Sequence, residues 1–441
     1  MNNEQNKIKT ENKQFNKQTN KQQTTNSLIL KPFLMKKIFV FAAVAASVLA
    51  VGCAKNEVTQ NVTQLGDAVQ FGVYVPQTKA GKAGQTTTTS IKLAEGSGGG
   101  FGVFAYYTDD ADYAGTTKPN FMYNQGVFWN STKWEYSPVK YWPNEFGASA
   151  HSAAIDKLTF FAYAPYVASA SGSYGITAMS ANTATGDPTI TYVVDPTPST
   201  AVDLCWGVNS ATGFPWRNQT KQAYNGTIPF LFKHALARLN VNVRGYFDEV
   251  RSVDSAVSTD NVDEHTKITI EKVVISGTFY PSGTLNLHNT SANTALWTPA
   301  AAAATTLTIP NADIAASLKA TVDGETSFPA ITGVTKTNVN IFTGEAPAKT
   351  DATYYTFIPK GSATTLNVKI TYYVTTQDAK LDGGISCVKN VIDKDIEFAS
   401  FACGLNYNLN IVLGMTTVKL EATVEDWADP SNVDIDLPVN L

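Results

Sequence analysis

The residues that could support catalysis or metal binding are few and scattered along this chain. Its 441 residues include four histidines and four cysteines, and none forms the closely spaced Cys/His cluster of a structural zinc site. His234 stands beside the apolar residues Phe232 and Leu236, which favours a core or interface histidine over a catalytic one. We therefore expect no metal, no cofactor and no enzymatic activity.

Two further segments resemble binding loops, and both fail on inspection. Asp109, Asp110 and Asp112 look like the start of a calcium loop, but Phe121 stands where the closing carboxylate would be. The glycine-rich segment 96–102 leads into an apolar strand pattern, so it lacks the helix N-terminus that binds phosphate. The sequence does not single out a pair of carboxylates that could hydrolyse a glycosidic bond.

The chain begins with features of an exported protein. Residues 1–34 are polar, and Met35 is followed by two lysines and an apolar stretch at 38–51. That stretch is shorter than the roughly 20 residues of a membrane-spanning helix, and the pattern is typical of a secretory signal peptide. We expect translation to start at Met35 and residues 1–52 to be absent from the mature protein.

The end of this signal contains a candidate lipidation site. The sequence Leu-Ala-Val-Gly-Cys at 49–53 resembles a bacterial lipobox, although Ala50 stands where leucine is commonest. By that resemblance Cys53 would be acylated, with palmitate among the acyl chains, and become a membrane anchor. An ordinary signal peptide that ends near a cysteine is the alternative. Three cysteines remain, an odd number, and a pairing of Cys387 with Cys403 is left open.

Composition and charge exclude several classes of function. Charged residues make up 16% of the chain, against a usual value of about 25%. The net charge is −4, and removing residues 1–52, which hold eight lysines and two glutamates, leaves −10. This acidic balance argues against a nucleic-acid partner, because phosphate binding needs a concentrated basic surface.

From Cys53 onward the chain predicts strand after strand. Apolar residues alternate with polar ones, or run together in short stretches, between turn residues. The candidate strands are 69–75, 103–107, 158–163, 239–243, 268–275 and 366–374. Helical periodicity is weak, and 314–320 is the best candidate for a helix. Many short strands at this spacing predict an all-β fold of β-sandwiches.

A linker-like stretch divides the chain. Residues 209–226 are rich in Gly, Asn, Thr and Gln, and we place a domain boundary near residue 222. The expected organisation is an upstream extension and signal peptide at 1–52, followed by β-sandwich domains at 53–222 and 223–441.

The C-terminus has the clearest strand pattern. Every second residue is apolar, which places five large side chains on one face of a single strand. These residues are Val433, Ile435, Leu437, Val439 and Leu441. Pro438 cannot donate to a ladder, so an edge or added strand is favoured. The segment is either the last strand of its own sheet or a donor strand that inserts into another subunit.

Several segments, in this order, resemble the fimbrillin family of Bacteroidetes, which comprises fimbrial (pilus) subunits and tip lipoproteins. They are FGVFAYY at 101–107, YNQ at 123–125, WEYSPVKYWP at 134–143, LTFFAYAP at 158–165, FKHALARL at 232–239, FIP at 357–359, GLNY at 404–407 and VEDW at 424–427. The resemblance runs over most of the mature chain. It implies two tandem transthyretin-like β-sandwich domains and a role in adhesion at the cell surface.

The resemblance also implies an assembly mechanism. The precursor would reach the outer membrane as a lipoprotein, and a surface maturation protease would remove the first strand, here 69–75. The gap would accept a strand from a neighbouring fimbrial subunit by donor-strand exchange. We expect cleavage after Lys79 or Lys82, although family members are often cut after arginine and no arginine stands in this loop.

An alternative function uses the aromatic residues. Trp129, Trp134 and Trp142 lie in one short block, and exposed aromatic rings stack on sugars. We favour a core role for these rings. The alternative is an outer-membrane surface lipoprotein that binds glycans or host proteins without polymerising, with host or bacterial surface molecules as its ligands.

Overall fold

The computed structural model describes residues 68–74, 86–87, 89–143, 155–221, 227–246, 265–347, 353–414, 418–426 and 432–433. The chain divides into two compact units, Met1–Gln64 and Leu65–Leu441, and all described residues belong to the second. Strands dominate them, which confirms the all-β prediction. The helical elements with described bounds are three 3-10 turns, η1 (Ser90–Lys92), η2 (Asn311–Asp313) and η3 (Asp382–Gly384). None of the described helices is long and apolar enough to cross a membrane.

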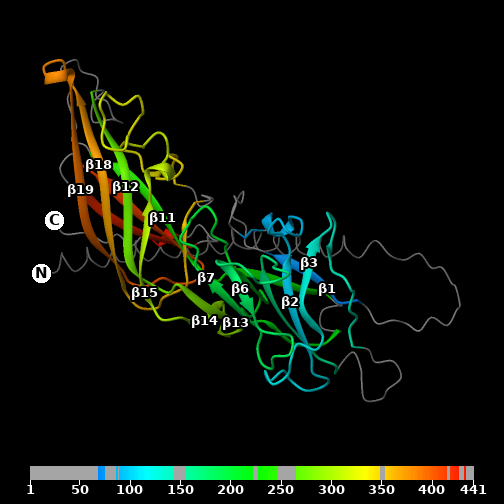
Figure 1. Cartoon of the computed structure of the whole chain (residues 1–441). Helices are drawn as coiled ribbons and strands as arrows, with labels where there is room; N and C mark the ends of the chain where they lie inside the picture. The colour runs from blue at the N-terminus through cyan, green and yellow to red at the C-terminus, as the bar shows by residue number, and fades with distance from the viewer. Residues whose placement is uncertain are drawn as a thin grey trace, which may run out of the picture. The chain divides into compact units, whose positions relative to one another are not determined.

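The first sheet has the order β1-β10-β8-β5-β2-β3-β4, and β9 pairs with β5 beside it (Figure 1). Its strands are β1 (Gln70–Tyr74), β2 (Phe101–Tyr107), β3 (Met122–Trp129), β4 (Trp134–Glu135), β5 (Leu158–Ala164), β8 (Cys205–Val208), β9 (Trp216–Gln219) and β10 (Thr227–His234). The second sheet has the order β14-β13-β7-β6. Its strands are β6 (Gly175–Met179), β7 (Thr189–Val193), β13 (Ser282–Ser291) and β14 (Thr294–Pro299).

Both faces of the first sheet are buried. One face packs against the second sheet, where Phe104 and Phe161 meet Ile190 and Leu285. Side chains of the opposite face form a second hydrophobic cluster, which we call the first-strand core. It includes Val69, Phe71, Ile91, Phe101, Phe160, Phe230 and Phe232. Burial on both faces explains why β2 and β5 are almost continuously apolar in sequence.

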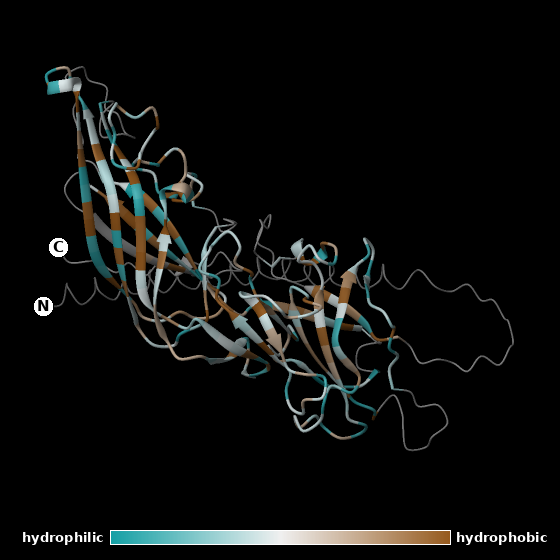
Figure 2. Cartoon of the chain, in the orientation of Figure 1, coloured by the Kyte–Doolittle hydropathy of each residue, from teal (hydrophilic) through white to brown (hydrophobic). Residues whose placement is uncertain are grey.

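Two further sheets enclose a separate core. One has the order β16-β11-β20-β21-β22, with β17 paired to β11, and the other has the order β15-β12-β18-β19. Their strands are β11 (Ala237–Gly245), β12 (Thr266–Phe279), β15 (Ala303–Ile309), β16 (Val339–Asn340), β17 (Tyr355–Phe357), β18 (Thr364–Gln377), β19 (Ile385–Phe398), β20 (Leu405–Leu413), β21 (Val418–Asp426) and β22 (Asn432–Val433). Figure 2 shows hydrophobic and hydrophilic bands along β12, β18 and β19, as expected for strands with one buried face.

All six predicted strands are confirmed, as β1, β2, β5, β11, β12 and β18. The helix predicted at 314–320 is wrong. Ile314 and Leu318 are buried in the core of the third and fourth sheets, and Lys319 forms a β-bridge with Ile270, so packing overrides a weak helical pattern. The stretch predicted as a linker contains β9, and β10 still pairs with β8 of the first sheet.

Candidate functional site

The first described strand lies at the end of the first sheet. β1 pairs in parallel with β10, from Gln70 opposite Thr227 to Tyr74 opposite Leu231. A parallel pair cannot be closed by a short hairpin, and the two strands are indeed far apart in the chain. β1 is therefore an edge strand whose place in the sheet depends on its own side chains and on five residue pairs.

The side chains of β1 alternate between core and solvent. Val69 and Phe71 are 1% and 6% exposed, while Gln70 is exposed. The Phe71 ring lies 6.0 Å from the rings of both Phe160 and Phe230, and 6.1 Å from that of Phe101. Aromatic pairs at these spacings add to the free energy gained from burial. A short edge strand thus supplies the centre of the first-strand core.

The other side of this segment is also occupied. The backbone N–H of Val69 donates to the carbonyl of Lys140 at 2.9 Å, and the hydroxyl of Tyr136 donates to the carbonyl of Val69 at 2.8 Å. Ala68 forms an antiparallel bridge with Tyr141. The segment 68–74 therefore lies between β10 and the segment 136–141, and it fills the space between them.

Most of the predicted site residues lie outside the described residues. These are Cys53, Lys79, Lys82, Ile435, Leu437, Val439 and Leu441. Val433 is described as part of β22, where it pairs antiparallel with Val424 at the edge of the third sheet. The start of the terminal segment thus adds to its own sheet. Its use as a donor strand stays a prediction.

A buried polar cluster follows the predicted cleavage loop. The backbone N–H of Thr86 donates to Asp203 Oδ2 at 2.9 Å, and its hydroxyl donates to the Asp203 carbonyl at 2.8 Å. His234 Nδ1 lies 2.7 Å from the same Oδ2, and the two side chains are 0% and 4% exposed for Asp203 and His234. His234 is buried, in agreement with its expected place in the core.

Asp203, Cys205 and His234 offer the ligand types that zinc prefers, within 4.8 Å of one another. Two ligands on one tetrahedral zinc lie roughly 3.3 Å apart, given metal–ligand bonds of about 2.1 Å. The 2.7 Å between Asp203 and His234 is instead a hydrogen-bond length. Burial raises the pKa of the Cys205 thiol, and the neighbouring Asp203 raises it further, so the thiolate that binds metal is disfavoured. The cluster is a hydrogen-bonded pair rather than a set of metal ligands.

The three tryptophans of the aromatic block contribute to packing. Trp142 is 1% exposed and lies 5.9 Å from Phe160, while Trp134 lies 5.2 Å from Phe101. Trp129 is half-buried, and the Lys92 ammonium lies 4.1 Å from its ring centroid. The faces of these rings are largely used within the protein, so they do not form an open platform for sugars.

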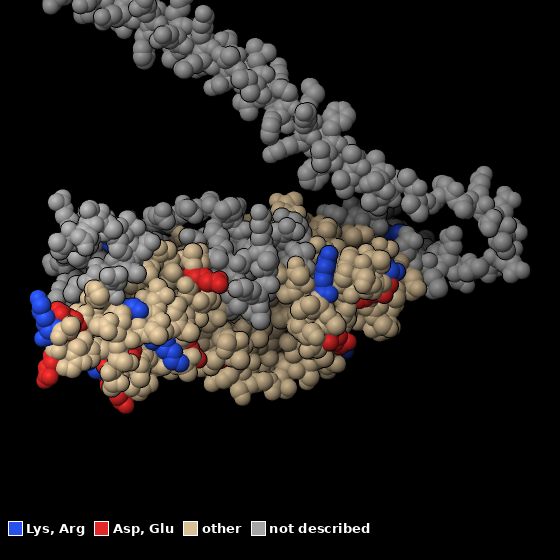
Figure 3. All heavy atoms as spheres, turned by 90° about the horizontal axis from the view of Figure 1, so that it is seen from above, with Lys and Arg blue, Asp and Glu red and all other residues tan. Residues whose placement is uncertain are grey.

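The acidic loop after β2 is also satisfied internally. Lys157 Nζ lies 2.8 Å from Asp112 Oδ1 and donates to the carbonyl of Asp110 at 2.7 Å. A lysine thus occupies the position where a calcium ion would have to bind. Figure 3 shows that charged side chains are sparse and scattered on one face of the molecule.

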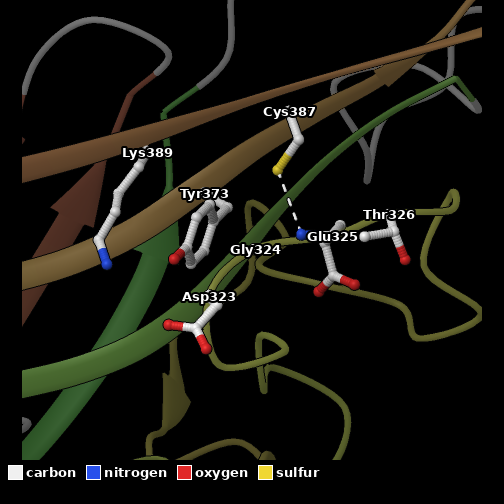
Figure 4. Close-up of a pocket in the computed structure, with 7 residues that line it drawn as sticks. All are labelled: Asp323, Gly324, Glu325, Thr326, Tyr373, Cys387 and Lys389. Atoms are coloured by element: carbon white, nitrogen blue, oxygen red, sulfur yellow. Dashed lines mark hydrogen bonds between the residues drawn. The ribbon is translucent and has the colours of Figure 1, made fainter. Parts of the chain in front are cut away.

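A pocket with a volume of about 390 Å³ lies at the edge of the fourth sheet, and Figure 4 shows the residues that line it. Lys389 and Tyr373 project from β19 and β18, and the turn 323–326 lies opposite. Lys389 is bound to Glu271 at 2.8 Å, and this hydrogen bond raises the pKa of Lys389. The lysine is thereby kept charged, which is unsuited to a nucleophile or general base. Cys387 accepts hydrogen bonds from Glu325 and Thr375, and Cys387 and Cys403 are both free thiols.

Sequence reasoning missed Asp203 and Thr86. An aspartate directly before the apolar run LCWGV was a weak signal, because it combines a charge with a strand that must be buried. Its partners lie 117 and 31 residues away, and no sequence spacing shows that they meet.

These observations define a class, a β-sandwich protein whose first core is completed by a separate edge strand. A family model described as fimbrillin-like matches residues 58–427, and the chain belongs to this family. It is similar to the fimbrium subunit Fim1C of Phocaeicola vulgatus, with 26% identity over 418 residues that cover 89% of this chain and 97% of that protein. It is also similar to the crystal structure of a fimbrial protein from Bacteroides vulgatus, with 25% identity and a TM-score of 0.56 over 82% of this chain and 99% of the other.

The predicted resemblance is thus confirmed. The family consists of subunits of cell-surface fimbriae, structural proteins that interact with other fimbrial subunits rather than enzymes.

Proposed function

We propose that this protein is a structural subunit of a fimbrium that assembles by protease-triggered donor-strand exchange and contributes to adhesion. The observation that carries the proposal is the place of β1, an edge strand whose buried side chains complete the first-strand core. A single cut in the chain after it would separate this strand from the rest of the protein.

The vacated space would need a replacement. Full burial of a valine or phenylalanine side chain stabilises a protein by roughly 1.5–3 kcal/mol. Val69, Phe71 and the half-buried Val73 together account for several kcal/mol, a large part of the roughly 5–15 kcal/mol that holds a domain folded. A subunit without its first strand is therefore a receptor for a strand of similar pattern.

The terminal segment has such a pattern. Val433, Ile435, Leu437, Val439 and Leu441 place an apolar side chain at every second position, as Val69, Phe71 and Val73 do in the first strand. In the proposed polymer this segment of one subunit pairs with β10 of the next, and its side chains fill the first-strand core. Main-chain hydrogen bonds would supply affinity, and the pockets would set the register.

Export and processing complete the proposal. A lipid on Cys53 would hold the precursor at the outer membrane, and a surface protease would then cut after Lys79 or Lys82. Both lysines stand in a loop rich in small and polar residues, which is the kind of sequence that proteases cut. We also propose the two-domain organisation, because β10 contributes to the first-strand core and β11 to the core of the third and fourth sheets, while β13 and β14 return to the second sheet.

A pair of matched double variants tests the donor role. Ile435→Asp with Leu437→Asp places charges on the apolar face of the terminal segment, and this variant should be exported and folded but should form no fimbriae. Asp434→Asn with Asp436→Asn changes the opposite face and should polymerise normally. Electron microscopy and shearing of cells supply the readout. Normal fimbriae from the first variant would contradict the proposal and favour a surface lipoprotein that binds its ligands without polymerising.

A further inference from the structure

The buried cluster around Asp203 includes Thr86, which follows Lys79 and Lys82 in the sequence. Thr86 is the first described residue after the predicted cleavage sites, and it is 5% exposed. We propose that Thr86, Asp203 and His234 form a latch, which keeps the chain from Thr86 onward bound to the subunit when the first strand leaves. The inference rests on the proposed function, because it concerns what happens at the same cleavage.

The geometry of the latch is that of a fixed attachment point. The Asp203 carboxylate accepts the Thr86 backbone N–H at 2.9 Å and faces His234 Nδ1 at 2.7 Å. A second bond joins the Thr86 hydroxyl to the Asp203 carbonyl at 2.8 Å. Hydrogen bonds to a charged group are stronger than neutral ones, and water cannot replace them readily at this depth. The same oxygen, Asp203 Oδ2, therefore contacts both His234 and Thr86.

The residues after Thr86 extend the attachment into the core. Thr87 and Ser90 exchange hydrogen bonds, from the Thr87 N–H to Ser90 Oγ at 2.7 Å and from the Ser90 N–H to Thr87 Oγ1 at 3.0 Å. This reciprocal pair shapes the turn that leads into η1, as in a capping box. Ile91 follows, is 0% exposed and belongs to the first-strand core together with Val69 and Phe71.

In the sequence, the latch residue Thr86 thus lies between β1 and Ile91, which both contribute to the first-strand core. Cleavage after Lys79 or Lys82 would free β1, whereas Ile91 would stay in place because Thr86 remains attached. One wall of the vacated groove is then preserved for the incoming strand. Without the latch, the new N-terminus could peel away as far as Ile91, and the receptor groove would lose that wall.

Hydrogen exchange at the Thr86 amide measures the latch directly. We would follow the peptide that covers residues 83–93, in which Thr86 is preceded by three residues, in the full-length protein before and after limited digestion with trypsin, which cuts after lysine. The wild-type amide should be protected in both states. Cleaved chains should start at Ala80 or Ala83, and the Lys92–Leu93 bond should stay intact.

Matched variants assign the protection to these residues. Thr86→Val removes the hydroxyl but keeps the shape, while Thr86→Ser keeps the hydroxyl. A hydrogen bond of ordinary strength predicts about fivefold to tenfold faster exchange in Thr86→Val and little change in Thr86→Ser. A second variant, Asp203→Asn, weakens the contacts of this carboxylate with both the Thr86 N–H and His234. It should accelerate exchange at Thr86 more than Thr86→Val does, and digestion should yield new chains that start at Leu93.

The outcomes separate the latch from the proposed function. Equal exchange in Thr86→Val and Thr86→Ser, or loss of wild-type protection once the loop is cut, would overturn the latch. A native protein that is never cut after Lys79 or Lys82 would overturn the proposed processing instead. Exchange at Thr86 in the uncut protein would still report the latch in that case.

Discussion

Two edge strands of this molecule have opposite properties. β1 has five residues and pairs with a strand far away in the chain, and Phe71 in it and Val69 directly before it are almost completely buried. β19 has fourteen residues, pairs with its sequence neighbour β18 along its whole length, and leaves Val388 and Val391 about half exposed. The shorter strand therefore contributes more to a core than its few backbone pairs would suggest.

The two strands also differ in how the chain connects them to their sheets. β19 is attached at both ends to strands of its own sandwich, through η3 on one side and through the turn before β20 on the other. Among the described residues no strand precedes β1, so the chain connects β1 to the described strands of its sheet on its C-terminal side, where a single cut would release it. A strand that is rich in core contacts and poor in chain connections can be replaced by another strand of the same pattern.

Removal of the first strand should cause the largest loss of stability, and this loss should be confined to the first-strand core. In a protein that begins at Ala83, we expect amides of β10 and β2 to exchange at least about 100-fold faster, since several kcal/mol of burial are lost. Amides of β12 and β18 should be unchanged. A peptide with the sequence of residues 433–441 should restore protection of β10, and a peptide with its apolar residues replaced by serine should not. An equal loss of amide protection in both cores would contradict the special role of β1 in the first-strand core.

Single substitutions on the two edge strands should differ by several kcal/mol. Phe71→Ala removes a ring from a packed aromatic cluster and should lower the free energy of unfolding by about 3–5 kcal/mol. Val391→Ala on β19 should cost less than about 0.5 kcal/mol, because this side chain is largely in solvent. Denaturant unfolding monitored by tryptophan fluorescence gives both values. A cost for Phe71→Ala near that of the control would mean that β1 does not support the first-strand core.

The pair formed by His234 and Asp203 should behave as a unit. His234→Ala leaves the Asp203 carboxylate buried without its imidazole partner, which should cost about 3 kcal/mol. Asp203→Asn should then be much less harmful in the His234→Ala background than in the wild type. A double-mutant cycle measures this coupling. Strict additivity of the two changes would show that the residues do not depend on each other.

The smallest effect concerns Asp187, which joins the second sheet to the loops of the first. Burial alone would raise its pKa, but hydrogen bonds with His288, Asn286 and Tyr113 together lower it. A lowered pKa stabilises the fold above the ordinary aspartate value of about 3.9, and this contribution is lost as the pH falls below it. Asp187→Asn should therefore flatten the stability profile between roughly pH 5 and 2. Because the group is partly exposed, we expect an effect of about 1 kcal/mol or less, and an unchanged profile would contradict the assignment.

Much of the fold could be predicted from local pattern. Alternation at 69–75 and 366–374 identified β1 and β18, and the apolar run at 158–163 identified β5. These strands pack against a buried surface whichever strands pair with them, so their own pattern of apolar residues is enough to predict them. The segment 314–320 was misjudged because its apolar residues satisfy a core from an irregular turn, where spacing no longer reports the conformation.

The site could be predicted only in part. The pairing of β1 with β10 and of β11 with β20 is parallel, and parallel partners are chosen by tertiary packing that no local pattern records. The meeting of Asp203, His234 and Thr86 depends on the same packing. Sequence reasoning identified the first strand, whereas the structure was needed to show what surrounds it.

The N-terminus of the protein on its native cell surface tests the central claim most directly. Mass spectrometry of sheared and membrane fractions identifies it in each pool. We predict that the sheared fimbriae contain chains that start at Ala80 or Ala83, and that a lipid-modified Cys53 occurs only in the membrane fraction. Sheared polymers whose chains still begin at Cys53 and retain residues 69–75 would contradict exchange of the first strand.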